Sequence, residues 1–335
     1  MNLNQLKYAL AVAREKSFSR AAKLCHVSQP SLSVAVKHLE EELGLPLFER
    51  FKSEIQITRH GERVLEQIQK VLEEVDRIHV MARGGTDPLC GQLRIGAILT
   101  IGPYLFPGVI PAFHHIAPKM KLLVEENYTH VLSERLKRGE LDAIFIALPF
   151  QEHGVEVLPL YDEPFIVAVP TGHLWQNRTD LTGAELADDD LILLGKGHCF
   201  RDQVLEICPE CMRLEDTVAG PGNIINGSSL ETIRHMVATG AGVSVLPITS
   251  VNTLLCTTPV CPNKESRMVQ YVSFAHPVPN RRVALAWRSS FPYPQVIDAM
   301  VSAVRMTPPV GVRFLSQDDL NAPSPSAYLE KSSNC

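Results

Sequence analysis

The sequence predicts an N-terminal winged helix-turn-helix domain, a long linker helix and a C-terminal α/β domain. Three features indicate this order. Two helical segments separated by a tight turn lead to the stretch SQPS, which has the short polar residues of a helix start. Hydrophobic residues then recur at alternating spacings of four and three between residues 64 and 82. Beyond residue 91, strand-like segments alternate with helical ones, which is the pattern of parallel βαβ units.

Length, composition and charge narrow the class of protein. The 335 residues suffice for two or three domains, and 45% hydrophobic residues are ordinary for a globular chain. Because no apolar run approaches the ~20 residues that cross a bilayer and no signal-peptide cleavage site is present, we expect a cytoplasmic protein without membrane contact. Residues 1–70 carry eleven Lys or Arg against eight Asp or Glu, whereas the rest is acidic. A basic front favours a polyanion such as DNA as partner.

The first helices of the basic front follow from spacing and caps. Leu6, Leu10 and Ala13 predict a helix over residues 3–17, since residues three and four apart share one face. Ser19 is expected to cap a short second helix, RAAKL, and after the turn CHV Ser28 is expected to cap a third. Two helices joined by such a turn indicate a helix-turn-helix.

The third helix, SLSVAVKHLEEELG, has the features of a recognition helix. Pro30 lies in its first turn, where no N–H is needed, and Gly44 is expected to end it. Val34, Leu39 and Leu43 are expected to face inward. Short polar side chains at a helix N-terminus can enter a major groove while the N–H groups meet phosphate. This end of the helix is therefore the predicted DNA contact.

A wing and a dimerisation helix are predicted next. FERFKSEIQITRHG alternates as a short hairpin, on which Arg50, Lys52 and Arg59 are placed to contact backbone phosphates. The following helix, residues 62–85, has a narrow seam made of Val64, Ile68, Val71, Val75, Ile78 and Ala82. Such a helix is marginal alone, so we expect self-association, with packing onto its own chain as the alternative.

The body alternates strands and helices. Strands are expected at 92–98, 121–127, 141–148, 165–170, 190–195, 242–247 and 283–287. Helices are expected between them, one opened by a capping box from Ser228 to Glu231 and the last at 294–305. Parallel strands with crossover helices are therefore the predicted architecture of the body.

Eight cysteines are many for a reducing compartment. Because a chain of this size needs no disulfide framework, metal binding or redox chemistry is the better explanation. Cys25 and Cys90 are expected to be simple buried apolar residues. Zinc binding by Cys208, Cys211, Cys256 and Cys261 is an alternative, although the spacing of the second pair is unusual for zinc.

Cys199 and Cys208 lie at the two ends of a predicted helix, FRDQVLEI. At 1.5 Å per residue their Cα atoms are ~13–14 Å apart, whereas a disulfide needs roughly 4.4–6.8 Å. Bonding therefore requires the helix to unfold, and Pro209 leaves its end easy to unravel. A helix N-terminus, together with Lys196, His198 and Arg201, favours a thiolate at Cys199. The pair is a candidate oxidant-driven switch.

The stretch FSRAAKLCHVSQPSLSVAVKHLEEELGLPLFER is similar to the winged helix-turn-helix of LysR-type transcriptional regulators. The resemblance covers roughly residues 1–306 and implies a dimerising linker helix and an effector domain of two Rossmann-like lobes, like periplasmic binding proteins. Phe51 and Lys52 depart from the usual wing. The resemblance implies that these residues contact DNA or its phosphates: Ser28, Gln29, Pro30, Ser31, Ser33, Lys37 and Arg50.

The domain boundaries expected from this resemblance are as follows. Residues 1–61 form the DNA-binding domain, 62–85 the linker helix and 86–90 a hinge. Lobe I comprises 91–163 and 268–306, and lobe II comprises 164–267. Residues 307–335 are rich in Pro and Ser without periodicity and are expected to be a disordered tail.

GHCFRDQVLEIC, GPYLFP, SLETIRHMVATGAG and RRVALAWR resemble the hydrogen peroxide-sensing members of the family. The resemblance implies a peroxidatic Cys199 and a resolving Cys208, with peroxide bound by Thr100, Thr129, His198 and Arg282. It further implies a homodimer or homotetramer that activates transcription on promoter DNA, contact with RNA polymerase, reduction by glutaredoxin or thioredoxin, and no cofactor or metal.

Departures from this pattern leave alternatives open. VAGPGNIING, residues 218–227, is longer and richer in glycine than its counterpart, and Cys211 adds a thiol that competes for Cys199. A LysR-type regulator gated by a small molecule between the lobes is the main rival. A thiol peroxidase and a zinc-controlled repressor are the others. A Cys199→Ser protein that still responds to an inducer would favour the regulator gated by a small molecule.

Overall fold

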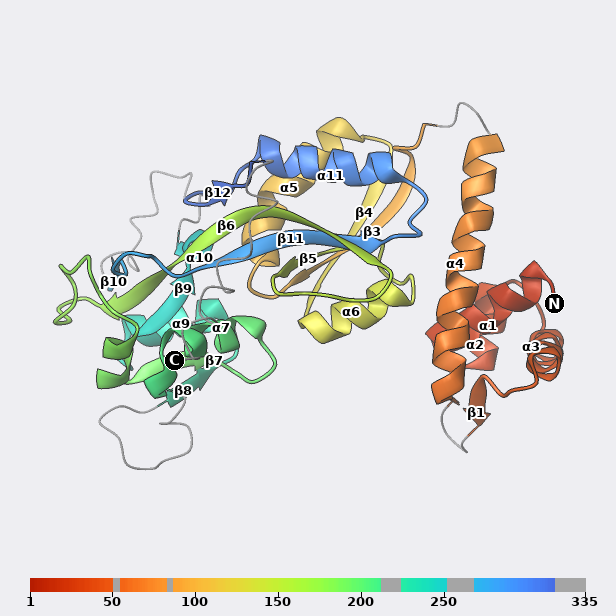
Figure 1. The fold of residues 1–335 in the computed structure, drawn as a ribbon, viewed down its shortest axis with the longest axis horizontal. Helices are drawn as coiled ribbons and strands as arrows, with labels where there is room; N and C mark the ends of the chain where they lie inside the picture. The colour runs from red at the N-terminus through yellow and green to blue at the C-terminus, as the bar shows by residue number, and fades with distance from the viewer. Residues whose placement is uncertain (51–54, 83–86, 212–223, 252–267, 317–335) are drawn as a thin grey trace, which may run out of the picture.

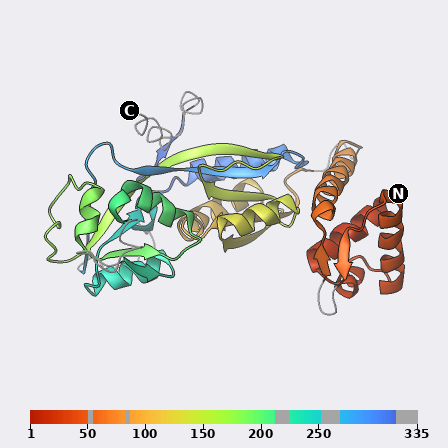
Figure 2. The same cartoon turned by 60° about the horizontal axis from the view of Figure 1, so that its bottom comes forward.

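The computed structural model describes residues 1–50, 55–82, 87–211, 224–251 and 268–316. Three bodies lie in a row, each with a separate hydrophobic core (Figure 1). The DNA-binding body is at one end, the first lobe in the middle and the second lobe at the other end, and Figure 2 shows the same order from a second direction. No helix in these described ranges is long and apolar enough to cross a membrane.

Three helices form the DNA-binding body, in the predicted order: α1 (Leu3–Glu15), α2 (Phe18–Leu24) and α3 (Gln29–Leu43). Ser28 caps α3 by accepting from the Ser31 N–H, and Gly44 ends it with a left-handed φ of 70°, as predicted. The cap of α2 is Ser17 rather than Ser19. Val34 does not face inward, because 56% of it is exposed. The buried side of α3 is made of Leu32, Val36 and Leu39.

The wing forms as predicted, from the antiparallel strands β1 (Phe48–Arg50) and β2 (Ile55–Ile57). The linker helix α4 (Arg59–Ala82) follows directly. Its predicted seam is divided. Ile68 is buried in the DNA-binding core and Val64 packs against it, whereas Val71 and Ile78 are 38% and 62% exposed. Val64 and Ile68 therefore pack on their own chain, whereas Val71 and Ile78 expose apolar surface that could meet a partner.

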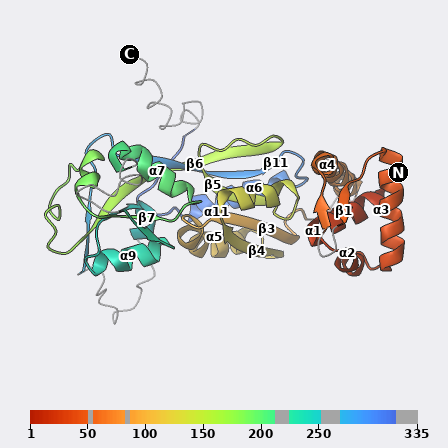
Figure 3. The same cartoon turned by 90° about the horizontal axis from the view of Figure 1, so that it is seen from below.

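The first lobe is an α/β layer structure. Its elements are β3 (Gly91–Ile98), α5 (Gly102–Ile116), β4 (Met120–Asn127), α6 (Thr129–Lys137), β5 (Ala143–Ala147), β11 (Asn280–Arg288) and α11 (Pro294–Met306). Strand β3 pairs in parallel with β4 and β5, as predicted for βαβ units, and β11 closes the sheet antiparallel to β5. Helices α5 and α11 cover one face of this sheet and α6 covers the other (Figure 3).

A single long strand, β6 (Val155–Pro170), joins the lobes. Its residues 155–164 pair with β11 of the first lobe. Its residues 165–170 pair with two strands of the second lobe, β9 (Ser244–Pro247) and β10 (Val269–Val272). Strand β10 packs in the hydrophobic core of the second lobe, which we call the second core. The chain re-enters the first lobe at β11, so the predicted boundary at residue 268 is wrong.

The second lobe contains the segment with the paired cysteines. Its other elements are η1 (Ala184–Asp188), β7 (Leu191–Leu194), α7 (Cys199–Ile207), β8 (Ile224–Gly227), α9 (Leu230–Ala238) and α10 (Ile248–Val251). One prediction needs correction here. Ser229, not Ser228, caps α9. The end of the glycine-rich stretch forms β8 parallel to β7, because its backbone N–H and C=O groups complete that sheet. Residues 212–223 lie outside the described part.

The predicted tail is partly ordered. Residues 313 and 314 form β12 (Arg313–Phe314), antiparallel to β6. The ring of Phe314 lies 5.7 Å from that of Tyr161, and Arg313 pairs with Asp162 at 3.1 Å. These contacts explain why the chain stays on the first lobe after α11. Residues 317–335, with Cys335, are outside the described ranges.

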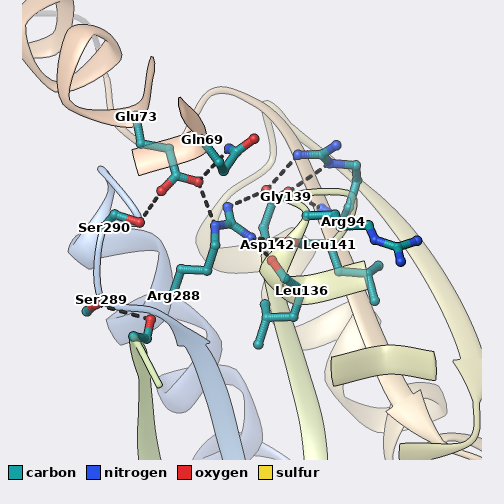
Figure 4. Close-up of polar contacts among 12 residues, drawn as sticks. Gln69, Glu73, Arg94, Leu136, Gly139, Leu141, Asp142, Arg288, Ser289 and Ser290 are labelled. Atoms are coloured by element: carbon teal, nitrogen blue, oxygen red, sulfur yellow. Dashed lines mark hydrogen bonds and ion pairs between the residues drawn. The ribbon is translucent and has the colours of Figure 1, made fainter. Parts of the chain in front are cut away.

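A buried polar cluster connects the linker helix to the first lobe (Figure 4). Glu73 of α4 accepts from Arg288 Nε at 2.6 Å and from Gln69 Nε2 at 2.8 Å, and Ser290 also donates to it. Arg14 of α1 donates to Gln69 Oε1 at 3.0 Å. Glu73 is 5% exposed and Arg288 6%. Since a buried charge is stable only when it is paired, this cluster fixes α4 against the effector domain.

We expect Arg288→Leu to lower the free energy of unfolding by about 3–5 kcal/mol, because it leaves the Glu73 carboxylate buried without its cation. Urea unfolding measures this loss, and amide exchange in α4 should rise with it. Arg305 on α11 is exposed, so Arg305→Ala is the matched control and should change stability by less than about 0.5 kcal/mol. Equal stability of the two variants would contradict a structural role for the cluster.

Candidate redox site between the lobes

A glycine turn positions the N-terminus of α7. Strand β7 ends at Leu194, and Gly197 then takes a φ of 100°, which L side chains rarely adopt. His198 is the N-cap and Cys199 the first residue of the helix. The thiol therefore lies at the positive end of the helix dipole, where negative charge is favoured.

Cys199 lies where the two lobes meet. It belongs to a helix of the second lobe, yet its partly buried side chain packs against the core of the first lobe. The next residue, Phe200, is 2% exposed and packs in the second core. Gln203 on the same helix donates to the Leu148 carbonyl of the first lobe at 3.3 Å. The helix is thus attached to both lobes.

His198, which precedes Cys199, packs on Tyr128, which precedes Thr129. Its ring is 7% exposed and lies 4.8 Å from the ring of Tyr128, in an edge-to-face arrangement. Tyr128 directly precedes Thr129, the first residue of α6. The Thr129 hydroxyl is buried and has no hydrogen-bond partner among the described residues. An unpaired buried hydroxyl is costly and uncommon, so Thr129 offers both a donor and an acceptor to a small polar molecule.

On the other side of Cys199, Phe200 leads to an arginine. The guanidinium carbon of Arg281 lies 5.0 Å from the centre of the Phe200 ring. Arg281 donates to Thr100 Oγ1 at 2.7 Å and to Glu163 Oε2 at 2.7 Å. Thr100, Glu163 and Arg281 are all nearly inaccessible to solvent. A fixed cation and the hydroxyl that it holds therefore lie beside Phe200, the residue that follows Cys199 in the chain.

The structure does not place Arg282 in this group. Arg282 forms a bidentate ion pair with Asp162, at 2.7 and 3.1 Å, instead of meeting Thr100. The reason is strand geometry: successive side chains of β11 point to opposite faces, so Arg281 and Arg282 cannot share a site. The arginine beside Thr100 is therefore Arg281, whereas the expected peroxide contact of Arg282 stays a prediction. The alternation of β11 is the signal that could have found it.

Cys208 is not a free thiol in the structure. It is the C-cap of α7, is fully buried and forms a disulfide with Cys211, with Cα atoms 5.4 Å apart. Cys199 is a free cysteine. The helix between Cys199 and Cys208 is intact over nine residues, as predicted, so the two Cα atoms are about 13 Å apart. The alternative pairing of Cys199 with Cys211 is not formed.

The intact helix is held by buried contacts. Phe200, Val204 and Leu205 are 6% exposed or less and belong to the second core. Burying such side chains stabilises the fold by about 1.5–3 kcal/mol each. Arg201 donates to the Leu194 carbonyl and to Asn226 Oδ1, so it joins α7 to β7 and β8. Unfolding α7 therefore costs several kcal/mol.

Nothing in the described ranges supports the zinc alternative. No cluster of three or more potential metal ligands occurs among those residues. Cys208 and Cys211 are joined to each other, and Cys256 and Cys261 lie outside the described residues. Cys25 is half-buried and packs against the DNA-binding core, whereas Cys90 is exposed and is not the buried residue that the sequence suggested.

Most of the predicted DNA contacts lie in the first turns of α3, with Lys37 farther along the helix and Arg50 on β1. Ser28, Gln29, Pro30 and Ser31 are exposed, as is Lys37, whereas Ser33 is half-buried. Lys37 lies 3.4 Å from Glu41 in a solvent-exposed pair, which contributes little and leaves it available. Exposed Val34 falls between Ser31 and Lys37 on the same helix face, a position suited to a thymine methyl. The side chain of Arg50 and all of Lys52 are outside the described part.

Comparisons with known proteins agree with this architecture. Residues 3–62 match the model of the bacterial regulatory helix-turn-helix protein, lysR family, and residues 86–307 match the LysR substrate binding domain. The chain belongs to the LysR family. Members of this family are DNA-binding regulators, so the helix-turn-helix and the two-lobed effector domain are confirmed.

Individual LysR proteins are similar over nearly the whole chain. The hydrogen peroxide-inducible genes activator of Pectobacterium carotovorum is 37% identical over 304 residues, which are 90% of this chain and 96% of that protein. Full-length OxyR C199D of Pseudomonas aeruginosa is 47% identical, with a TM-score of 0.82 over 95% of this chain and 99% of that one. An H2O2-bound mutant of Corynebacterium glutamicum OxyR is 30% identical, with a TM-score of 0.58 over 91% and 92% of the two chains.

We expect His198 to make stability depend on pH. Burial lowers the pKa of His198, so below about pH 6.5 the unfolded chain binds a proton that the folded chain resists. Stability should therefore fall as the pH drops from about 7 to about 5, and it should fall less in His198→Gln. Urea unfolding at each pH measures this. His115→Gln, at an exposed position, should follow the parent chain, and equal slopes for all three would contradict the prediction.

Proposed function

We propose that the chain is a transcriptional activator that senses hydrogen peroxide by oxidation of Cys199. One observation carries the proposal. A free cysteine lies between the lobes at the N-terminus of α7, nine helical residues from a second cysteine that it cannot reach while the helix is intact. The similarity to proteins named OxyR and hydrogen peroxide-inducible genes activator supports the choice of peroxide as signal.

The chemistry starts at the sulfur of Cys199. Its thiolate attacks one peroxide oxygen, the O–O bond breaks, and its electrons leave with the other oxygen as hydroxide. Thr129 and His198 orient the peroxide from one side, while Arg281 and Thr100 stabilise charge from the other. Arg281 takes the role that the sequence assigned to Arg282.

The second step stores the signal. In the chain whose Cys208–Cys211 disulfide has been reduced, the Cys208 thiolate attacks the sulfenic acid of Cys199, the S–O bond breaks, and water leaves after protonation. The new disulfide brings the two Cα atoms to within roughly 7 Å, so α7 must unfold. Phe200, Val204 and Leu205 then leave the second core, and the surface of this lobe changes.

The output is a changed assembly on DNA. An apolar groove of α1, α3 and α4 is lined by Leu43, Leu45, Val64, Ile68 and Val71, and it suits a second copy of the chain. A two-fold dimer presents two copies of α3 to successive major grooves. A homotetramer then rearranges on the promoter and contacts RNA polymerase in the cytoplasm. Glutaredoxin or thioredoxin returns the chain to the reduced form.

We expect the response to depend on Cys199 and Cys208. The chain is fully reduced with a dithiol, bound to promoter DNA and given one equivalent of peroxide, and disulfides are mapped after rapid acid quenching. The parent chain should form the 199–208 disulfide and change its footprint. Cys199→Ser should do neither, and Cys208→Ser should stop at the sulfenic acid. Cys90→Ser removes an exposed thiol and serves as control. A footprint of Cys199→Ser that still responds would favour a small-molecule effector instead.

Two neighbouring arginines allow a matched test of the site. Arg281→Lys keeps the charge but loses the fork that binds Thr100 and Glu163 together. We expect the rate of Cys199 oxidation to fall about 10²-fold, the usual effect of removing one such donor. Arg282→Lys alters the pair with Asp162 on the other face and should leave the rate nearly unchanged. Equal effects of the two substitutions would argue against Arg281 as a peroxide contact.

A further inference from the structure

The Cys208–Cys211 disulfide is a second redox centre of this chain. It needs no refolding, because the Cys211 N–H donates to the Cys208 carbonyl at 3.0 Å and this turn holds the Cα atoms 5.4 Å apart. Both cysteines are fully buried in the second core. Helix α7 is intact beside it, and Cys199 is free. The structure thus shows an oxidised Cys208 together with a reduced Cys199.

We propose that Cys211 resets the peroxide switch by taking Cys208 away from Cys199. The oxidising equivalents of peroxide pass from the 199–208 disulfide to the 208–211 disulfide. Cys199 returns to a thiolate and α7 refolds while the chain as a whole stays oxidised. The proposal rests on the proposed function and adds an internal limit to the duration of its signal.

The exchange balances without an external reactant. The Cys211 thiolate attacks the Cys208 sulfur of the 199–208 disulfide, the S–S bond between Cys199 and Cys208 breaks, and its electron pair leaves on Cys199. One disulfide is lost and one is formed, so no net oxidation or reduction takes place. The leaving thiolate returns to the helix N-terminus, where negative charge is favoured.

The direction of exchange follows from burial. The 199–208 disulfide requires α7 to be unfolded, whereas the 208–211 disulfide coexists with it. Exchange therefore returns Phe200, Val204 and Leu205 to the second core. The apolar surface that these side chains bury favours the local disulfide by about a hundredfold or more at equilibrium.

The reset chain is unresponsive until it is reduced. Cys208 no longer offers a thiol, so a second peroxide molecule oxidises Cys199 only to the sulfenic acid. Because neither sulfur of the 208–211 pair is exposed, a dithiol reductant reaches it only when the second lobe opens. Recovery of the switch is therefore expected to be slower than its reset.

The test follows disulfides and promoter footprint together. The full-length chain is reduced, freed of reductant and given one equivalent of peroxide, then quenched at times from under a second to hours, the range of disulfide exchange. In the parent chain the 199–208 disulfide should appear first and then give way to 208–211, while the footprint returns to its reduced form. In Cys211→Ser, 199–208 and the altered footprint should persist. Cys90→Ser should behave like the parent chain.

The outcomes separate this inference from the proposed function. If the parent chain ends with the 199–208 disulfide intact and with a Cys211 thiol that can be alkylated, the proposed reset is overturned, whereas the proposed peroxide sensor is not. A Cys211→Ser chain that folds but never forms 199–208 overturns the sensor. Should Cys211→Ser fail to fold, the parent time course decides alone. When a second equivalent of peroxide is added after the reset, dimedone should trap Cys199 as the sulfenic acid. Formation of the 199–208 disulfide a second time would contradict the inference.

Discussion

Helix α7 is attached to two bodies at once, and the behaviour of the candidate site depends on this attachment. Cys199 packs against the core of the first lobe, and the next side chain, Phe200, is buried in the second. While the helix is intact, its length sets the distance from Cys199 to Cys208 at about 13 Å. A bond between these sulfurs therefore cannot form as a local adjustment. It must remove a helix from a core, which converts one covalent bond into a change of shape.

The same attachment explains why Cys211 matters. A resolving thiol at the end of a helix is useful only while it is free to move toward Cys199. The turn from Cys208 to Cys211 supplies a partner that is already within bonding distance. Pairing of Cys208 with Cys211 leaves α7 buried, whereas pairing of Cys208 with Cys199 would require α7 to leave the core. Under the proposed exchange, the two disulfides are alternative states of one thiol, and folding energy decides between them.

Much of the fold could be predicted because local rules determine it. The N-cap at Ser28 was predicted correctly because Pro30 marks the first turn of the helix, and the end at Gly44 because glycine readily adopts a left-handed conformation. Ser17, not Ser19, caps α2, because two serines close together are equally good caps. Exposed Val34 was placed inward because spacing alone does not show which face meets DNA. Arg281 rather than Arg282 lies beside Thr100 for a similar reason, since motif matching ignores which face of β11 a residue occupies. The Cys208–Cys211 bond depends on the turn after α7, which spacing left open.

Strand β11 runs from the candidate redox site to the linker helix, and an arginine near each end of the strand holds a residue there. Arg281 holds Thr100 and contacts Phe200, while Arg288 holds Glu73 of α4. The strand is paired on both sides, with β5 and with β6. A strand fixed in this way resists bending, so it supports both ends rather than changing between two shapes. The segment that unfolds in the proposed switch is α7, which belongs to the second lobe, the body farthest from the DNA-binding domain in Figure 1. A signal that begins there reaches DNA most directly through another copy of the chain docked on that lobe, which favours an assembly-based output over transmission along one protomer.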